Sequence, residues 1–213
     1  MMNDAPLPLS AALGIDAVVI GASAGGIEAL GTLLPALPAD FAPPVLVVQH
    51  IVPDHASLLA ELFADRCAVR VEEASDKREI AGGCIYFAPP DYHLQVEPDR
   101  TLALSVDDAV NFSRPSIDVL FESAAWTYGP RLLGILLTGA SPDGAAGLLA
   151  IRQAGGRTWV QDPATAAMDI MPLAAIGLGA AQEILTLSIM ARRLGRAPHS
   201  VEDPPARPDP WRT

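Results

Sequence analysis

Three residues of this sequence have the chemistry of a nucleophile, a base and an orienting acid. Ser23 lies in the small-residue segment Gly21-Ala22-Ser23-Ala24-Gly25, which fits the pattern G-x-S-x-G, while His50 follows the apolar segment VLVVQ and Asp143 lies in the turn of ILLTGASPDGAAG. A serine hydroxyl becomes a strong nucleophile when an imidazole accepts its proton, and a carboxylate keeps that imidazole in the required tautomer. The residue types therefore predict acyl-transfer chemistry at a Ser-His-Asp triad.

Each of these residues comes just after a predicted buried strand. The strands are expected at 17–21, 45–49 and 131–139, where apolar and β-branched residues form continuous runs. In an open α/β sheet the carboxyl ends of parallel strands form one edge, and binding residues gather there. We therefore expect Ser23, His50 and Asp143 to lie at the same sheet edge. Taken alone, however, Asp143 before a glycine is an ordinary turn or cap residue.

The other histidines are less well placed for this role. His55 is expected to start a helix, His93 falls in a segment predicted as a ribbon, and His199 lies near the C-terminal end of the sequence. His50 is therefore the preferred base.

The order of predicted elements indicates an α/β fold with a doubly wound, mainly parallel sheet, a Rossmann-like three-layer αβα arrangement. Strands alternate with helices expected at 26–37, 55–66, 115–128, 144–154 and 173–179, and a further strand is expected at 157–162. Between residues 69 and 106 the short segments VRVEEA, CIYFAPPDYHLQVEP and TLALSV contain interspersed polar residues. We expect these three segments to form an inserted antiparallel hairpin or ribbon.

The glycine-rich turn after the first strand also fits a second interpretation, an anion site of the dinucleotide-binding kind. Ser23 stands where the middle glycine of G-x-G-x-x-G would let a pyrophosphate approach, and Asp40 lies in a loop and not after the second strand, where an acid would hold a ribose. These two departures weaken the dinucleotide interpretation.

Composition limits the classes of partner and compartment. The chain has 213 residues, half of them hydrophobic, and a formal net charge of -11, which disfavours a nucleic-acid surface. It contains no apolar run long enough for membrane insertion, and its N-terminus lacks the basic flank of a signal peptide. Cys67 and Cys84 have no metal-ligand spacing and are predicted to be small buried side chains. We expect a cytoplasmic protein without a metal.

Three regions are expected along the chain. Residues 1–15 form an N-terminal extension, residues 16–194 a single catalytic domain, and residues 195–213 a proline-rich disordered tail.

The ordered set of motifs resembles the catalytic domain of the chemotaxis protein-glutamate methylesterases, the CheB family. The resemblance extends from about residue 16 to residue 194 and rests on VVIGASAGGIEAL, VVQHIVPDH, YFAPPDYHL, RPSIDVLFESAA, LLGILLTGASPDGAAGLLAIRQAGG and QDPATAAMDIMPLAAI. It implies hydrolysis of glutamyl methyl esters on chemoreceptors, with release of methanol, and deamidation of certain receptor glutamines. It also implies that Ser23, His50 and Asp143 are the nucleophile, base and acid, and that no metal or organic cofactor takes part.

Further site residues follow from the turn and from the resemblance. The resemblance places an oxyanion donor at the backbone N–H of Ala140, and Ala24, which follows the nucleophile, is the second candidate. Met171 occupies the position of a family motif and is a candidate substrate contact. Arg114 offers a positive charge to an acidic receptor helix, although an exposed arginine beside a helix is an equally good interpretation.

The sequence departs from the family in several respects. The family motifs GMP and APG appear here as Ile170-Met171-Pro172 and Ala88-Pro89-Pro90. The family pattern TGMGxDG appears here as Thr138-Gly139-Ala140-Ser141-Pro142-Asp143-Gly144, and only about fifteen residues precede the first strand, where the family usually carries a receiver domain. Control by a separate regulatory protein is one expectation. Two other functions stay open: a serine hydrolase acting on another ester or amide, and a catalytically weak binding module.

Overall fold

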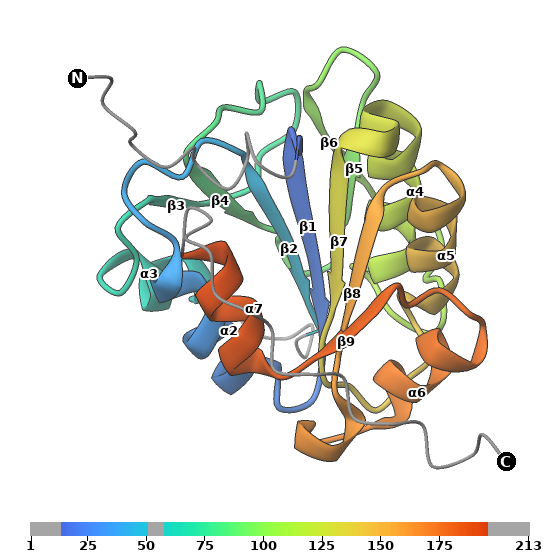
Figure 1. Cartoon of the computed structure of the whole chain (residues 1–213). Coiled ribbons are helices and arrows are strands. Elements are labelled where there is room, and N and C mark those ends of the chain that lie inside the picture. Colours follow the sequence, from blue (N-terminus) through green and yellow to red (C-terminus); the bar gives the residue numbers. More distant parts are fainter. Residues whose placement is uncertain (1–13, 51–57, 196–213) are drawn as a thin grey trace, which may run out of the picture.

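The computed structural model describes residues 14–50 and 58–195, and within them a twisted parallel sheet lies between two layers of helices (Figure 1). The predictions for the N-terminal extension, for His55 and for the proline-rich tail concern residues that lie wholly or mainly outside the described ranges. The strands are β1 (Ala17–Ala22), β2 (Val45–Gln49), β3 (Arg70–Glu73), β4 (Cys84–Phe87), β5 (His93–Val96), β6 (Leu102–Ser105), β7 (Leu132–Leu136), β8 (Arg157–Gln161) and β9 (Glu183–Leu185).

The helices include several that agree with the sequence-based expectations in type and approximate position. They are α2 (Gly26–Leu33), α3 (Leu59–Ala64), α4 (Ile117–Tyr128), α5 (Ala145–Gln153), α6 (Ile170–Gly177) and α7 (Leu187–Leu194). Short 3₁₀ turns follow α2 (Leu34–Ala36), α4 (Gly129–Arg131) and β8 (Pro163–Thr165).

The main sheet has the order β3-β4-β2-β1-β7-β8-β9, and each adjacent pair is parallel. β1 is central, with β2 on one side and β7 on the other, and Gly21 pairs with both Val48 and Leu136. The chain therefore leaves three neighbouring strands, β2, β1 and β7, at one edge of the sheet. Those exits carry His50, Ser23 and Asp143.

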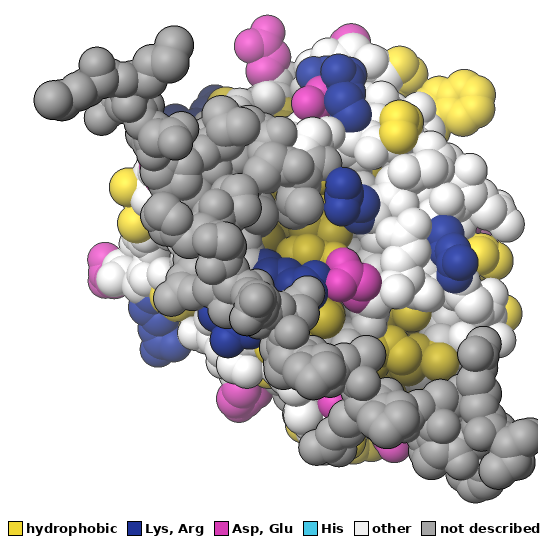
Figure 2. Space-filling model, viewed as in Figure 1, with side chains coloured by type: hydrophobic (Ala, Val, Ile, Leu, Met, Phe, Trp, Pro, Cys, Tyr) yellow, Lys and Arg dark blue, Asp and Glu magenta, His cyan; other side chains and the backbone are white. Residues whose placement is uncertain are grey.

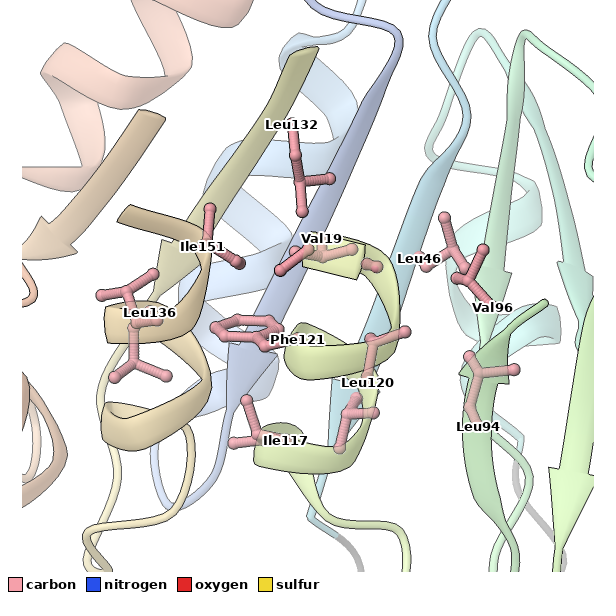
Figure 3. Close-up of a cluster of buried hydrophobic side chains, with 14 of the residues drawn as sticks. Val19, Leu46, Leu94, Val96, Ile117, Leu120, Phe121, Leu132, Leu136 and Ile151 are labelled. Carbon is pink, nitrogen blue, oxygen red and sulfur yellow. The ribbon is translucent and has the colours of Figure 1, made fainter. Parts of the chain in front are cut away.

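Hydrophobic packing on both faces of the sheet explains why its central strands lack in-out alternation. One face packs under α4, α5 and α6, and Figure 3 shows Phe121 and Leu120 of α4 and Ile151 of α5 gathered around Val19 of β1, with Leu94 and Val96 of β5 to one side. The other face packs against α2, α3 and α7. Strands buried on both sides are typical of parallel sheets covered by helices.

The structure corrects the predicted extent of the antiparallel ribbon. Among the strands that the structure describes, only β5 and β6 pair antiparallel, whereas β3 and β4 are parallel strands of the main sheet. β4 is buried at all of its positions, so its run CIYF is a core strand and not half of an exposed hairpin. Its pairing with β2 depends on contacts distant in sequence, which the local pattern of short apolar segments does not reveal.

The visible surface carries charges of both signs. Figure 2 shows Lys and Arg side chains interspersed with Asp and Glu side chains on the part of this face that is not grey. Among the residues that the structure describes, no helix has the length and apolar character needed to cross a bilayer.

Candidate active site

His50 and Asp143 meet at the carboxyl edge of the sheet. His50 Nε2 lies 2.9 Å from Asp143 Oδ2, and the side chains are 14% and 0% exposed, respectively. The residue after β2 and the turn before α5 are therefore joined by an ion pair or hydrogen bond that is almost closed to solvent. With Nε2 engaged, Nδ1 is the ring nitrogen left to take a proton from a nucleophile.

The Asp143 carboxylate is held by a dense set of donors. Its Oδ1 accepts hydrogen bonds from Asn111 Nδ2 at 2.9 Å and Ser116 Oγ at 2.8 Å, and its Oδ2 accepts the Ile117 N–H at 2.6 Å. The N–H of Asp118 adds a longer contact of 3.3 Å. Because Ile117 and Asp118 begin α4, the carboxylate also lies at the positive end of that helix.

This environment keeps Asp143 ionised. Burial by itself raises the pKa of Asp143, but the hydrogen bonds that it accepts, chiefly from His50 and Asn111, outweigh burial and lower the pKa from 3.8 to about 2. A fixed negative charge beside a histidine stabilises the imidazolium form of the ring, which is what a candidate base in the position of His50 requires.

Gln49 and Thr138 fix the turn that carries Ser23 to both neighbouring strands. The buried Gln49 side chain donates from Nε2 to the carbonyls of Ser23 and His50, each at 2.9 Å. On the other side the Ser23 N–H donates to the Thr138 carbonyl at 3.0 Å, and Thr138 Oγ1 donates to the Ala24 carbonyl at 2.9 Å. The positions of the nucleophile candidate and the base segment are therefore linked through one side-chain amide.

The backbone geometry and the close packing of this turn explain why glycine stands at two of its positions. Gly25 has φ +78°, a left-handed conformation that disfavours residues with a Cβ, and it immediately precedes α2. A Cβ at Gly26 would lie 2.0 Å from Gln49 Oε1 and 2.7 Å from the Ala22 Cβ. The glycines let Gln49 approach the turn closely, and no phosphate cradle is needed to explain them.

The two candidate oxyanion donors are both available. Ala24 and Ala140 are exposed, and neither backbone N–H donates a hydrogen bond to another residue in the part of the chain that the structure describes. Gly139 lies between the two turns, since a Cβ there would be 2.9 Å from the Ser23 Cβ and 2.5 Å from Met171 Cε. Unpaired N–H groups beside a nucleophile can bind the oxyanion of a tetrahedral intermediate.

The two candidate substrate contacts have different surroundings. Met171 is buried in α6, and its N–H donates to the Gly139 carbonyl at 3.0 Å, so it supports the turn opposite Ser23. Arg114 Nη1 donates to the carbonyls of Val106 and Asp107 at 3.0 and 3.1 Å, and Nη2 lies 3.8 Å from an Asp91 oxygen. The Arg114 guanidinium is therefore engaged by its own loop and by the turn between β4 and β5.

Sequence reasoning missed the residues that hold the acid and the nucleophile turn. They are Gln49, Ser116, Asp118 and Thr138, whose side chains are buried against the site, and Asn111, which is exposed but donates hydrogen bonds to Asp118 and Asp143. The role of Gln49 could have been predicted from the sequence, because Gln49 is the polar last residue of a wholly buried strand and directly precedes His50. Asn111 had none, because its contacts depend on the path of the connection between β6 and α4.

Both cysteines are free: Cys84 is buried, as expected, and Cys67 is half-buried. Within the described ranges, no three His, Cys, Asp or Glu side chains are grouped so that they could hold a metal ion.

A buried carboxylate with backbone and side-chain donors, paired to a histidine at the carboxyl edge of a parallel sheet, defines a hydrolase-type α/β site. The CheB methylesterase family model matches residues 18–194. The chain belongs to the CheB methylesterase family.

Individual relatives agree with this assignment. The chain is 46% identical over 176 residues to a putative protein-glutamate methylesterase/protein-glutamine glutaminase of Leptospira interrogans, covering 83% of this chain and 91% of that one. It is 41% identical to the protein-glutamate methylesterase/protein-glutamine glutaminase of Bordetella pertussis, covering 83% of this chain but 51% of that protein. The crystal structure of the Thermotoga maritima CheB methylesterase catalytic domain matches with a TM-score of 0.81 and 32% identity, covering 84% of this chain and 97% of that domain.

Proposed function

We propose that this protein is a protein-glutamate methylesterase that hydrolyses glutamyl methyl esters on methylated chemoreceptor cytoplasmic domains, with protein-glutamine deamidation as a second activity. The observation that carries the proposal is the contact between His50 Nε2 and the buried Asp143 carboxylate, 2.9 Å long, at the sheet edge where Ser23 leaves β1. Family membership and the names of the relatives favour this substrate class.

In the proposed mechanism Ser23 Oγ attacks the ester carbonyl while His50 Nδ1 accepts the hydroxyl proton. Asp143 holds the imidazole through Nε2 and stabilises its positive charge. The N–H groups of Ala24 and Ala140 bind the developing oxyanion. His50 then returns the proton to the departing methanol, and a water molecule activated by His50 releases the glutamate side chain from Ser23.

The test is to incubate the full chain with receptor membranes carrying labelled methyl esters and to measure methanol release. Ser23→Ala is the matched variant, and we expect it to abolish release, because the variant lacks the attacking oxygen. Equal release from the two proteins would refute the triad. Ammonia release from unmodified receptor glutamines measures the second activity in the same preparations.

A serine hydrolase acting on another ester or amide uses the same triad, so the N–H groups of Ala24 and Ala140, which have no acceptor among the described residues, support it equally. Labelling of Ser23 by a fluorophosphonate without methanol release would favour that alternative. A binding module needs neither His50 nor Asp143, and absence of both labelling and release would favour it. Control by a separate regulatory protein, cytoplasmic localisation and substrate contact by Arg114 stay predictions.

A further inference from the structure

Asn111 occupies an unusual position between two buried carboxylates. Its Nδ2 donates to Asp118 Oδ2 at 2.8 Å and to Asp143 Oδ1 at 2.9 Å, which uses both hydrogens of one amide. Asp118 and Asp143 are 7% and 0% exposed. Asn111 itself is exposed at the outer side of the pair. Two carboxylates that are bridged by one amide repel each other when both are charged, and the intervening pair of N–H donors offsets that repulsion.

The backbone around Asn111 is built to hold it there. Asn111 and Phe112 have φ +51° and +61°, and Val110 and Ser113 close a tight turn around them with backbone hydrogen bonds of 3.1 and 2.9 Å. Phe112, the other turn residue, is fully exposed. Asparagine tolerates the left-handed conformation better than most residues, so the turn directs its amide inward at low cost.

The far end of this connection is also fixed. The His93 Nδ1 atom accepts the Ser116 N–H at 3.2 Å, and His93 Nε2 lies 3.1 Å from the Asp108 carbonyl, so His93 ties together both ends of the connection that carries Asn111. With Nδ1 as acceptor, Nε2 carries the proton and donates it to the Asp108 carbonyl. The connection that carries Asn111 is therefore fixed before the turn, at Asp108, and after it, at Ser116, which keeps the Asn111 amide in place beside Asp143.

We propose that Asn111 is a positioning residue of the active site, whose side-chain amide fixes the Asp143 carboxylate for His50 and separates it from the Asp118 carboxylate. This inference rests on the proposed function only in taking Asp143 as the acid that orients His50. The two oxygens of Asp143 have different partners. Oδ2 faces His50 and the α4 N-terminus, while Oδ1 accepts hydrogen bonds from Asn111 and Ser116. Loss of the amide removes one of the three donors to Oδ1, the others being Ser116 Oγ and the Asp118 N–H, and increases the charge that the acid presents to the imidazole.

Titratable groups surround the site on several elements. Besides His50 after β2, these are Asp118 and Glu122 on α4, and His93 on β5 behind Ser116. Asp118 also lines a pocket of about 400 Å³, bounded by Asn111, Pro142, Ala145, Ala146, Ala174, Gly177 and Leu178. Solvent therefore reaches the Asp118 side of the amide, whereas the Asp143 side is closed.

The test measures the rate at which a fluorophosphonate labels Ser23 in the full chain between pH 5 and pH 9. This readout reports activation of the nucleophile and does not require the natural substrate. Asn111→Gly keeps the left-handed backbone and removes the amide, Asn111→Asp is isosteric and replaces donors with a charge, and Phe112→Gly is the matched control in the same turn.

We expect Asn111→Gly to lower the plateau labelling rate by about tenfold to a hundredfold, the range for losing a hydrogen bond to a charged group. We also expect the acid limb of the profile to move to higher pH, because a carboxylate that no longer shares its charge with the amide stabilises the imidazolium more strongly. Asn111→Asp should show a larger rate loss and a larger displacement, since it brings a third carboxylate to the pair. Phe112→Gly should leave the acid limb unchanged.

Unchanged profiles in both Asn111 variants would overturn the proposal, and so would a rate loss without any displacement of the acid limb, which a merely structural role would produce. Thermal unfolding of each variant identifies a folding failure. If Asn111→Gly does not fold, the isosteric Asn111→Asp decides the question. Ser23 labelling that responds to Asn111 as expected, together with absence of methanol release, would support this inference while refuting the proposed substrate.

Discussion

The carboxyl of Asp118 should make the protein less stable as pH rises, and Asp118→Asn should remove this effect. Burial raises the pKa of Asp118 from 3.8 to about 6; the N–H of Gly147 opposes the rise and the charge of Asp143 adds to it. Between about pH 4 and pH 6 the folded protein therefore holds a proton that the unfolded chain has lost. The stability contributed by that proton is present below pH 3.8 and is lost as pH rises through 6.

The size of the effect follows from the difference between the two pKa values. At about 1.36 kcal/mol for each pH unit, a change from 3.8 to about 6 corresponds to about 3 kcal/mol when the loss is complete. For a carboxyl whose pKa is 3.8 in the unfolded chain and about 6 in the folded protein, about half of that loss, roughly 1.4 kcal/mol, occurs between pH 5 and pH 8. The pocket beside Asp118 opens to solvent, so the measured value should lie at or below this figure.

The assay is urea unfolding at several pH values from 5 to 8, followed by the fluorescence of the buried Trp159 and the exposed Trp126. The free energy of unfolding of the wild type should fall relative to Asp118→Asn by about 1 kcal/mol over this range. Taking the difference between the two proteins cancels the titration of other groups. Glu122→Gln, on the exposed side of the same helix, removes the smallest of the named contributions to the Asp118 pKa and should keep most of the wild-type pH dependence. A constant difference between wild type and Asp118→Asn, or a difference of opposite sign, would refute the reasoning.

Two further predictions concern the supports of the triad. Gln49→Met removes the amide that bridges the carbonyls of Ser23 and His50, so we expect unfolding to become easier by about 2 kcal/mol and Ser23 labelling to slow, measured by urea unfolding and mass spectrometry. Normal labelling in a folded Gln49→Met protein would contradict this role. Asp143→Asn should reduce the labelling rate by about a thousandfold or more, because an amide cannot stabilise the imidazolium of His50. Labelling within tenfold of the wild type at pH 8 would exclude Asp143 as the orienting acid.

The sequence predicts the central sheet well because its strands can be recognised from the local pattern of residues. β1, β2 and β7 are continuous apolar runs followed by turns, and their order in space brings His50 and Asp143 together as expected. β4 escaped correct prediction because four buried residues have the same local appearance in a parallel core strand and in a ribbon. What distinguishes them is the pairing with β2, a contact across more than thirty residues of chain.

The residues of the site are predictable only in part, because some of them follow strands directly and others depend on the path of a long connection. Ser23 and His50 each follow a strand directly, so strand order alone determines where they leave the sheet. The position of Asn111 depends on two consecutive left-handed residues, a tight turn and the path of a long connection. Propensity gives only a weak indication of such a path, and the chemical role of Asn111 becomes visible only when both carboxylates have been placed.

The carboxylate proposed as the orienting acid also supports folding of α4. Ser116, at the start of α4, makes no side-chain cap to its own helix; its Oγ donates to Asp143, which also accepts the first helical N–H, that of Ile117. Asp143 thus caps α4 from a turn far along the chain, and capping groups typically contribute about 1 kcal/mol. Removal of its charge should weaken the helix and the triad together, whereas Ser23 Oγ makes no hydrogen bond within the described part of the chain. A loss of stability in Asp143→Asn that is absent in Ser23→Ala would therefore be evidence for this shared use of one carboxylate, and equal stability of the two variants would be evidence against it.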